Sequence, residues 1–106
     1  MRRAKEVYAA RKTKYSDSLM ISVCDADLVG KTLNQGNMVI TLSQDYFQEE
    51  VIEKEKVAYL LNECAIANLV GEKTVALAIS LGLAKEASVK RLCGIPFLMV
   101  FKFYHT

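Results

Sequence analysis

The segment from Ile95 to Phe103 constrains the fold more than any other part of the sequence. Its alternate positions are Phe97, Met99, Phe101 and Phe103 on one side and Leu98, Val100 and Lys102 on the other. A strand that is apolar on both faces is expected at a central position in a sheet. Pro96 has no N–H to donate to a strand ladder and fits only the first residues of such a strand. The segment therefore predicts an inner strand.

Shorter apolar runs predict the other strands. Residues 19–24 are β-branched and mostly apolar, and residues 38–42 follow a loop rich in Asp, Gly and Asn that spans residues 25–37. Residues 7–10 are expected to form a short first strand before a polar turn. Residues 89–92 fit either a strand or a helical turn.

Two helices are predicted in the second half of the chain. The first runs from about Ile52 to Ala67, because small and apolar residues recur there at the spacing of one helix face. Glutamates at positions 49 to 55 favour its start, where the helix dipole is positive, and Ser43 or Asp45 can cap that region. The second helix is almost wholly apolar and runs from about Glu72 to Leu81. The stripe of the first helix consists of Val57, Leu60, Leu61, Cys64, Ala65 and Asn68.

Length and element order together predict the architecture. A chain of 106 residues has the size of one domain, so residues 1–106 are expected to form a single domain, with disorder confined to residues 1–6. Short loops and a helix with one polar face fit a two-layer arrangement. We predict an α+β fold, in which a three- to four-stranded, mostly antiparallel sheet is packed on one face by two helices.

Composition excludes several classes of protein. The longest apolar run, from Ile95 to Phe101, is far shorter than the roughly 20 residues of a membrane span. No signal-peptide pattern is present, so we expect no membrane partner and a cytoplasmic location. The three cysteines, Cys24, Cys64 and Cys93, lack the paired spacing of a zinc site or a disulfide framework. We expect neither a metal nor a cofactor.

Residues 24–32, Cys-Asp-Ala-Asp-Leu-Val-Gly-Lys-Thr, end like a phosphate-binding loop. Such a loop needs a first glycine, where Asp25 stands, and a helix after the threonine, where the sequence predicts none. Two carboxylates, Asp25 and Asp27, would also repel a phosphate. We interpret the segment as a turn in which these aspartates bond backbone donors. The lone histidine, His105, lies next to the end of the chain, so no catalytic residue is assigned and a non-enzymatic protein is favoured.

The amino-terminal segment is the strongest functional signal. Residues 1–14 carry six basic side chains and one acidic one, a net charge of +5. Tyr8 and Tyr15 interleave there with Arg11, Lys12 and Lys14, a mixture that can contact phosphates and stack on exposed bases. Basic residues on a strand edge also keep other strands from pairing, so both interpretations stay open.

Three sequence blocks, in this order, resemble an archaeal family of unknown function, domain of unknown function family four-hundred-and-twenty-four. Its first block matches Cys24, Asp25, Leu28, Gly30 and Lys31, its second matches Asn68 through Glu72, and its third matches Gly94, Ile95 and Pro96. Members often have a polar residue, frequently histidine, directly after that proline, where this chain has Phe97. The resemblance implies a small α+β domain with no assigned catalytic residue.

These blocks suggest one partner-binding surface, because polar and glycine residues gather there in loops between apolar elements. Its expected residues are Asp25, Asp27, Gly30, Lys31, Asn68, Gly71, Glu72, Gly94 and Pro96. Three functions follow, in order of preference. The first is a non-catalytic module that binds RNA or an RNA–protein assembly, of the kind found in translation, through the basic amino-terminal hairpin. The second is a protein adaptor that uses the acidic face around Glu49 to Glu55, and the third is a small enzyme with its site at the two Leu-Val-Gly turns.

Overall fold

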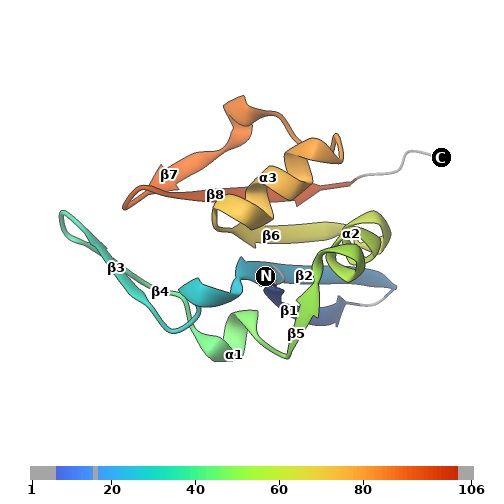
Figure 1. Ribbon diagram of the computed structural model, residues 1–106, viewed down its shortest axis with the longest axis horizontal. Coiled ribbons are helices and arrows are strands. Elements are labelled where there is room, and N and C mark those ends of the chain that lie inside the picture. The colour runs from blue at the N-terminus through green and yellow to red at the C-terminus, as the bar shows by residue number, and fades with distance from the viewer. Residues whose placement is uncertain (1–6, 16, 103–106) are drawn as a thin grey trace, which may run out of the picture.

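The computed structural model describes residues 7–15 and 17–102, so the expectations about residues 1–6, Phe103 and His105 lie outside the described part. Eight strands and three α-helices follow one another with short connections (Figure 1). In chain order they are β1 (Val7–Tyr15), β2 (Ser18–Asp25), β3 (Thr32–Gln35), β4 (Met38–Thr41), α1 (Gln44–Phe47), β5 (Glu50–Glu53), α2 (Lys54–Glu63), β6 (Ile66–Val70), α3 (Glu72–Ser80), β7 (Lys90–Leu92) and β8 (Ile95–Phe101).

Six of these strands form one sheet in the order β5-β1-β2-β6-β8-β7, and β3 and β4 form a separate hairpin. The predicted α+β class is confirmed, but the expected three or four strands are too few. Most neighbours are antiparallel as expected, whereas β2 and β6 pair in parallel, so the main sheet is mixed. The prediction that β8 is an inner strand is confirmed, since it lies between β6 and β7.

The strand that sequence analysis missed in the middle of the sheet is β6. The helical stripe was extended through Ala67 and Asn68, but α2 ends at Glu63 and the backbone of Cys64 is already extended. Residues 66–70 instead fill the gap between β2 and β8, where their N–H and C=O groups complete two ladders. Residues 66–70 continue the helical spacing of α2, but their place inside the sheet makes them a strand.

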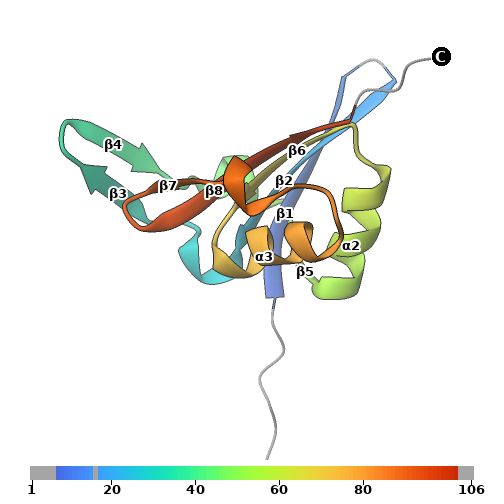
Figure 2. The same ribbon diagram turned by 90° about the horizontal axis from the view of Figure 1, so that it is seen from above.

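The main core lies between the sheet and the two longer helices, α2 and α3. The stripe of α2, from Val57 to Cys64, and the buried side of α3 pack there on alternate residues of β1, β2, β6 and β8. Both helices lie on the same side of the sheet, as predicted, and Figure 2 shows them together beneath it. This side of the sheet is closed.

The opposite side of the sheet is covered only in part. A second cluster packs there, formed by Cys24 and Val70 of the sheet with Leu42 and Phe47 from the region of α1 and the β3–β4 hairpin. Ser43 caps α1 by accepting a hydrogen bond from Tyr46 N at 3.2 Å. The hairpin projects beyond the end of the sheet (Figures 1 and 2), and its Gln35 side chain accepts a hydrogen bond from Cys93 N at 2.6 Å. The segments around α1 and the hairpin therefore cover only part of this side of the sheet.

Candidate functional site

The two Leu-Val-Gly blocks meet at one end of the sheet. Because β2 and β6 are parallel neighbours, Asp25 at the end of β2 lies beside Gly71, which follows β6. The buried Asp25 carboxylate accepts hydrogen bonds from Lys73 N at 3.1 Å, Thr74 N at 2.8 Å and Thr74 Oγ1 at 2.7 Å. These donors belong to the first turn of α3, so Asp25 caps a helix that begins 47 residues further along the chain.

Gly71 permits this contact for two reasons. Its φ of +109° belongs to a region that L-residues with a side chain rarely adopt. A Cβ atom at this position would also lie 2.4 Å from Cγ of Asp25, too close for any real contact. The glycine is therefore needed both for the backbone conformation and for the approach of the carboxylate.

This contact decides how residues 24–32 are interpreted. Strand β3 follows Gly30 and Lys31, which confirms that no helix begins at the Gly-Lys-Thr sequence. Asp25 does bond backbone donors as expected, but the donors belong to α3 and not to its own turn. Since the carboxylate already occupies the positive end of α3, that helix start is closed to a phosphate.

The third block joins the same end of the sheet. Gly71 N donates a hydrogen bond to the carbonyl oxygen of Pro96 at 3.0 Å. Arg91 Nη1 donates to Glu72 at 2.6 Å and to the carbonyl oxygen of Gly94 at 3.2 Å. The hydrogen bond from Arg91 lowers the pKa of the Glu72 carboxyl. The three blocks thus form one connected structure.

This connected structure differs from the expected partner surface in its exposure. Asp25, Gly71 and Pro96 are buried, so they offer no contact area to a partner. The exposed members are Asp27, Gly30, Lys31, Glu72 and Gly94, while Asn68 is half-buried on the partly covered side of the sheet. Whether the exposed members bind a partner stays a prediction.

The basic residues of β1 lie where RNA could reach them, but one tyrosine does not. Arg11, Lys12 and Lys14 are exposed, and the pairing of β1 with β5 stops at Ala10, so they stand on a free stretch of strand edge. Tyr8 is only 1% exposed and belongs to the main core. Its ring cannot stack on a base, so that prediction is wrong. The side chain of Tyr15 lies outside the described part.

The partly covered side of the sheet presents an apolar surface that we call the open face. It consists of Met20, Ile66, Asn68, Phe97, Met99 and Phe101. Met99 and Phe101 are 53% and 50% exposed, although large apolar side chains usually lie inside a protein. This face of β8 is therefore only partly covered, although β8 is an inner strand. Contiguous exposed apolar surface of this kind marks interaction sites.

A groove of about 420 Å³ runs along the open face between α1 and β7. Phe97 and Met99 of β8 line its floor, and Tyr46 and Lys90 line its sides. Asn68 donates from Nδ2 to the Tyr46 hydroxyl at 2.9 Å, which leaves its carbonyl oxygen and its second N–H for a ligand. The groove combines the aromatic rings of Tyr46, Phe47 and Phe97 with an amide and an ammonium group.

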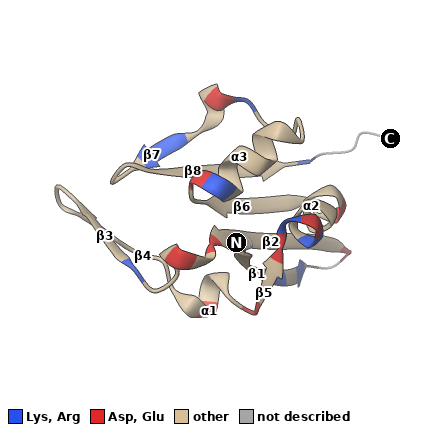
Figure 3. Ribbon diagram, viewed as in Figure 1, with Lys and Arg blue, Asp and Glu red and all other residues tan. Residues whose placement is uncertain are grey.

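Basic residues border the open face on two sides. The register places Arg11 in the same cross-strand row as Ser22, Asn68 and Met99, and it places Lys90 opposite Phe97. Figure 3 shows basic residues on β7, at one edge of the sheet. Arg11 Nη1 also donates to the backbone oxygen of Asp45, which holds the guanidinium beside α1. These rows carry no acidic side chain within the described residues.

Two of the three cysteines are buried and the third, Cys93, is partly exposed. Cys24 and Cys64 are buried in the two cores, and burial raises the pKa of the Cys24 thiol to about 12. Among residues 7–15 and 17–102, no group of three His, Cys, Asp or Glu side chains could hold a metal ion. In the same part of the chain, every helix is too short or too polar to span a bilayer.

Comparisons with other proteins give a family and one similar structure. A family model described as "Protein of unknown function (DUF424)" matches residues 13–103. An uncharacterized conserved protein from Methanopyrus kandleri has a crystal structure with a TM-score of 0.77 and 19% identity, over 94% of this chain and 96% of that one. No curated protein matches the chain. The identity is low, so this structure supports the fold alone.

Proposed function

The chain belongs to this family of proteins of unknown function, and we propose that it is a non-catalytic module that binds single-stranded RNA, alone or in a translation-related RNA–protein assembly. The observation that carries the proposal is the open face, where exposed apolar and aromatic side chains lie beside Arg11 and Lys90. Proteins that bind single strands combine stacking side chains with basic groups that follow the phosphates. We place this activity in the cytoplasm.

Each part of the open face has a chemical counterpart in RNA. Unpaired bases offer flat apolar faces, which can stack on Phe97, Tyr46 and Phe101. Their edges carry donors and acceptors, which match the free amide atoms of Asn68. The phosphates can be contacted by Lys90 on one side and by Arg11 on the other.

The two other functions have less support in the geometry. The acidic face expected of an adaptor is partly neutralised, because Lys56 Nζ lies 3.3 Å from a carboxylate oxygen of Glu50. An enzyme at the glycine turns would need a reactive carboxylate, but Asp25 is buried and accepts three hydrogen bonds from α3. Glu50 and Asp25 therefore serve interactions within the protein itself.

Fluorescence anisotropy with a labelled single-stranded oligoribonucleotide tests the proposal. The expected result is binding that weakens steeply with salt, because each contacted phosphate releases counterions. Replacing Arg11, Lys12 and Lys14 by alanine should reduce the slope of log affinity against log salt by about 0.7 for each phosphate that the variant no longer neutralises. Absence of binding at low salt overturns the RNA function. Capture of a protein that survives nuclease treatment would then favour the adaptor.

A further inference from the structure

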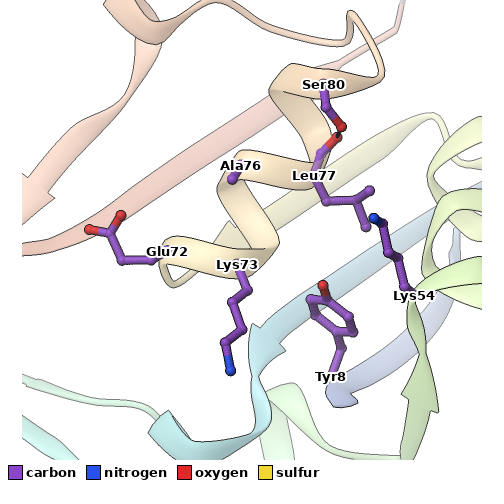
Figure 4. A pocket seen from close by; sticks show the side chains of 7 residues that line it. All are labelled: Tyr8, Lys54, Glu72, Lys73, Ala76, Leu77 and Ser80. Atoms are coloured by element: carbon purple, nitrogen blue, oxygen red, sulfur yellow. Dashed lines mark hydrogen bonds between the residues drawn. The ribbon is translucent and has the colours of Figure 1, made fainter. Parts of the chain in front are cut away.

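A second pocket lies on the helix side of the sheet, away from the open face. It has a volume of about 370 Å³ and is bounded by α3, by the first residue of α2 and by β1. Ala76 and Leu77 of α3 form one wall, and the ring of Tyr8 forms the floor (Figure 4). Its size falls within the range of pockets that hold small organic molecules.

The charged residues of this pocket are mainly basic. Within the described part of the chain, the ammonium groups of Lys54 and Lys73 form no salt bridge. Glu72, the acidic lining residue, is paired with Arg91 at 2.6 Å, and Figure 4 shows its carboxylate directed away from the other side chains. The neighbouring carboxylate of Asp25 faces the backbone of α3. Among the described residues, these two positive charges therefore have no acidic partner beside an apolar wall.

A hydroxyl group beside the two lysines adds hydrogen-bonding capacity. Figure 4 shows Lys54 and Lys73 on either side of the Tyr8 ring. The Ser80 hydroxyl donates to the backbone oxygen of Leu77 at 2.7 Å, so its own oxygen can still accept. The pocket thus has donors for an anion and an acceptor for a ligand hydroxyl.

The geometry points to a binding site for a small organic phosphate. A phosphate monoester carries a charge of about −1.5 to −2 near neutral pH, which matches the two ammonium groups. A carboxylate, with a single charge, would leave one lysine uncompensated. The apolar wall of Ala76 and Leu77 then receives the organic part of the ligand. Because Asp25 closes the start of α3, the lysine side chains bind the phosphate instead of the helix backbone.

An NMR titration of the ¹⁵N-labelled protein with phenyl phosphate tests this site. Saturable shifts are expected at the amides of Lys54, Lys73 and Leu77, and benzoate should bind more weakly. The variant K54Q/K73Q should weaken binding roughly tenfold or more, because it removes both charged donors. The control K31Q/K85Q changes two exposed lysines outside the pocket and should bind as the unchanged protein does.

Two results would overturn the organic-phosphate site. One is the absence of saturable shifts at these amides, and the other is equal affinity of K54Q/K73Q and the unchanged protein. A melting curve for each variant shows that it is folded. The outcome is separate from that of the RNA experiment, because neither Lys54 nor Lys73 belongs to the open face.

Discussion

At the scale of single residues, Asp25 holds the most informative position. It replaces the first glycine of a phosphate-binding loop, and its carboxylate occupies the helix start that a phosphate would otherwise use. Sequence analysis found the residue and its hydrogen-bonding role. It could not find the partner, because the pairing of β2 with β6 that brings α3 to Asp25 is not encoded in local spacing.

Replacing Asp25 by alanine should lower the free energy of unfolding by about 2 to 4 kcal/mol, since a buried helix start loses its charged acceptor. Urea denaturation followed by circular dichroism measures the change. Asp27→Ala is the matched control, because Asp27 is exposed and should change stability by no more than about 0.5 kcal/mol. Equal losses in the two variants would show that the cap does not stabilise the fold.

Alanine substitutions of Gly30 and Gly71 separate the cost of a positive φ from the cost of a steric clash. Both have positive φ, at +109° and +90°, but only the Cβ at position 71 would meet Asp25. Gly30→Ala should cost about 1 kcal/mol, from the backbone conformation. Gly71→Ala should cost at least about 2 kcal/mol more, because the carboxylate must also move. Similar melting temperatures for the two variants would contradict the close contact.

At the scale of elements, the sequence predicted α3 and β2 almost to their ends. It did not predict β3, α1, β5 or β6, or the full extent of β1. In the well-predicted α3 and β2, the spacing of apolar residues in the sequence matches the residues that are buried in the structure. In the region of α2, apolar residues continue beyond Cys64 at helical spacing, while the sheet requires a strand there. The number of strands was therefore underestimated for a reason that lies in tertiary pairing.

The end of α2 is bound by the residue that follows β8. Lys102, just after β8, donates from Nζ to the backbone oxygens of Leu61 and Asn62 in the last turn of α2. Lys102→Ala should lower the free energy of unfolding by about 1 kcal/mol, because these carbonyls lose a cationic donor. Lys85→Ala, at an exposed position outside the three α-helices, should leave the urea midpoint unchanged. No loss in Lys102→Ala would mean that α2 ends without this support.

At the scale of the whole molecule, the two faces of the sheet differ in their cover. Helices α2 and α3 close one face over the main core, whereas α1 and the β3–β4 hairpin cover only part of the other. The sequence contained the signal for the open face, since Phe97, Met99 and Phe101 alternate along β8. Alternation alone cannot show whether an apolar face is covered by the chain itself or left for a partner.

The candidate site was thus predicted in part. Of the basic residues of β1, Arg11 lies in a row of the open face, while the register turns Lys12 and Lys14 to the other side of the sheet. The aromatic residues that complete the groove come from α1 and β8. Tyr46 and Phe97 are 51 positions apart in the chain, and only the folded sheet brings them to one groove. Tyr8, which the sequence placed at the site, instead lies in the core on the other side.

The most direct test of RNA binding by the open face compares the affinities of three alanine variants for the same single-stranded oligoribonucleotide. Tyr46 and Phe101 are 46% and 50% exposed beside or on the open face, and Tyr59 is 62% exposed on α2. Tyr46→Ala and Phe101→Ala should each weaken binding about tenfold, because each removes a stacking partner, while Tyr59→Ala should bind as the unchanged protein does. Unchanged affinity in the first two variants, or an equal loss in the third, would contradict binding at the open face.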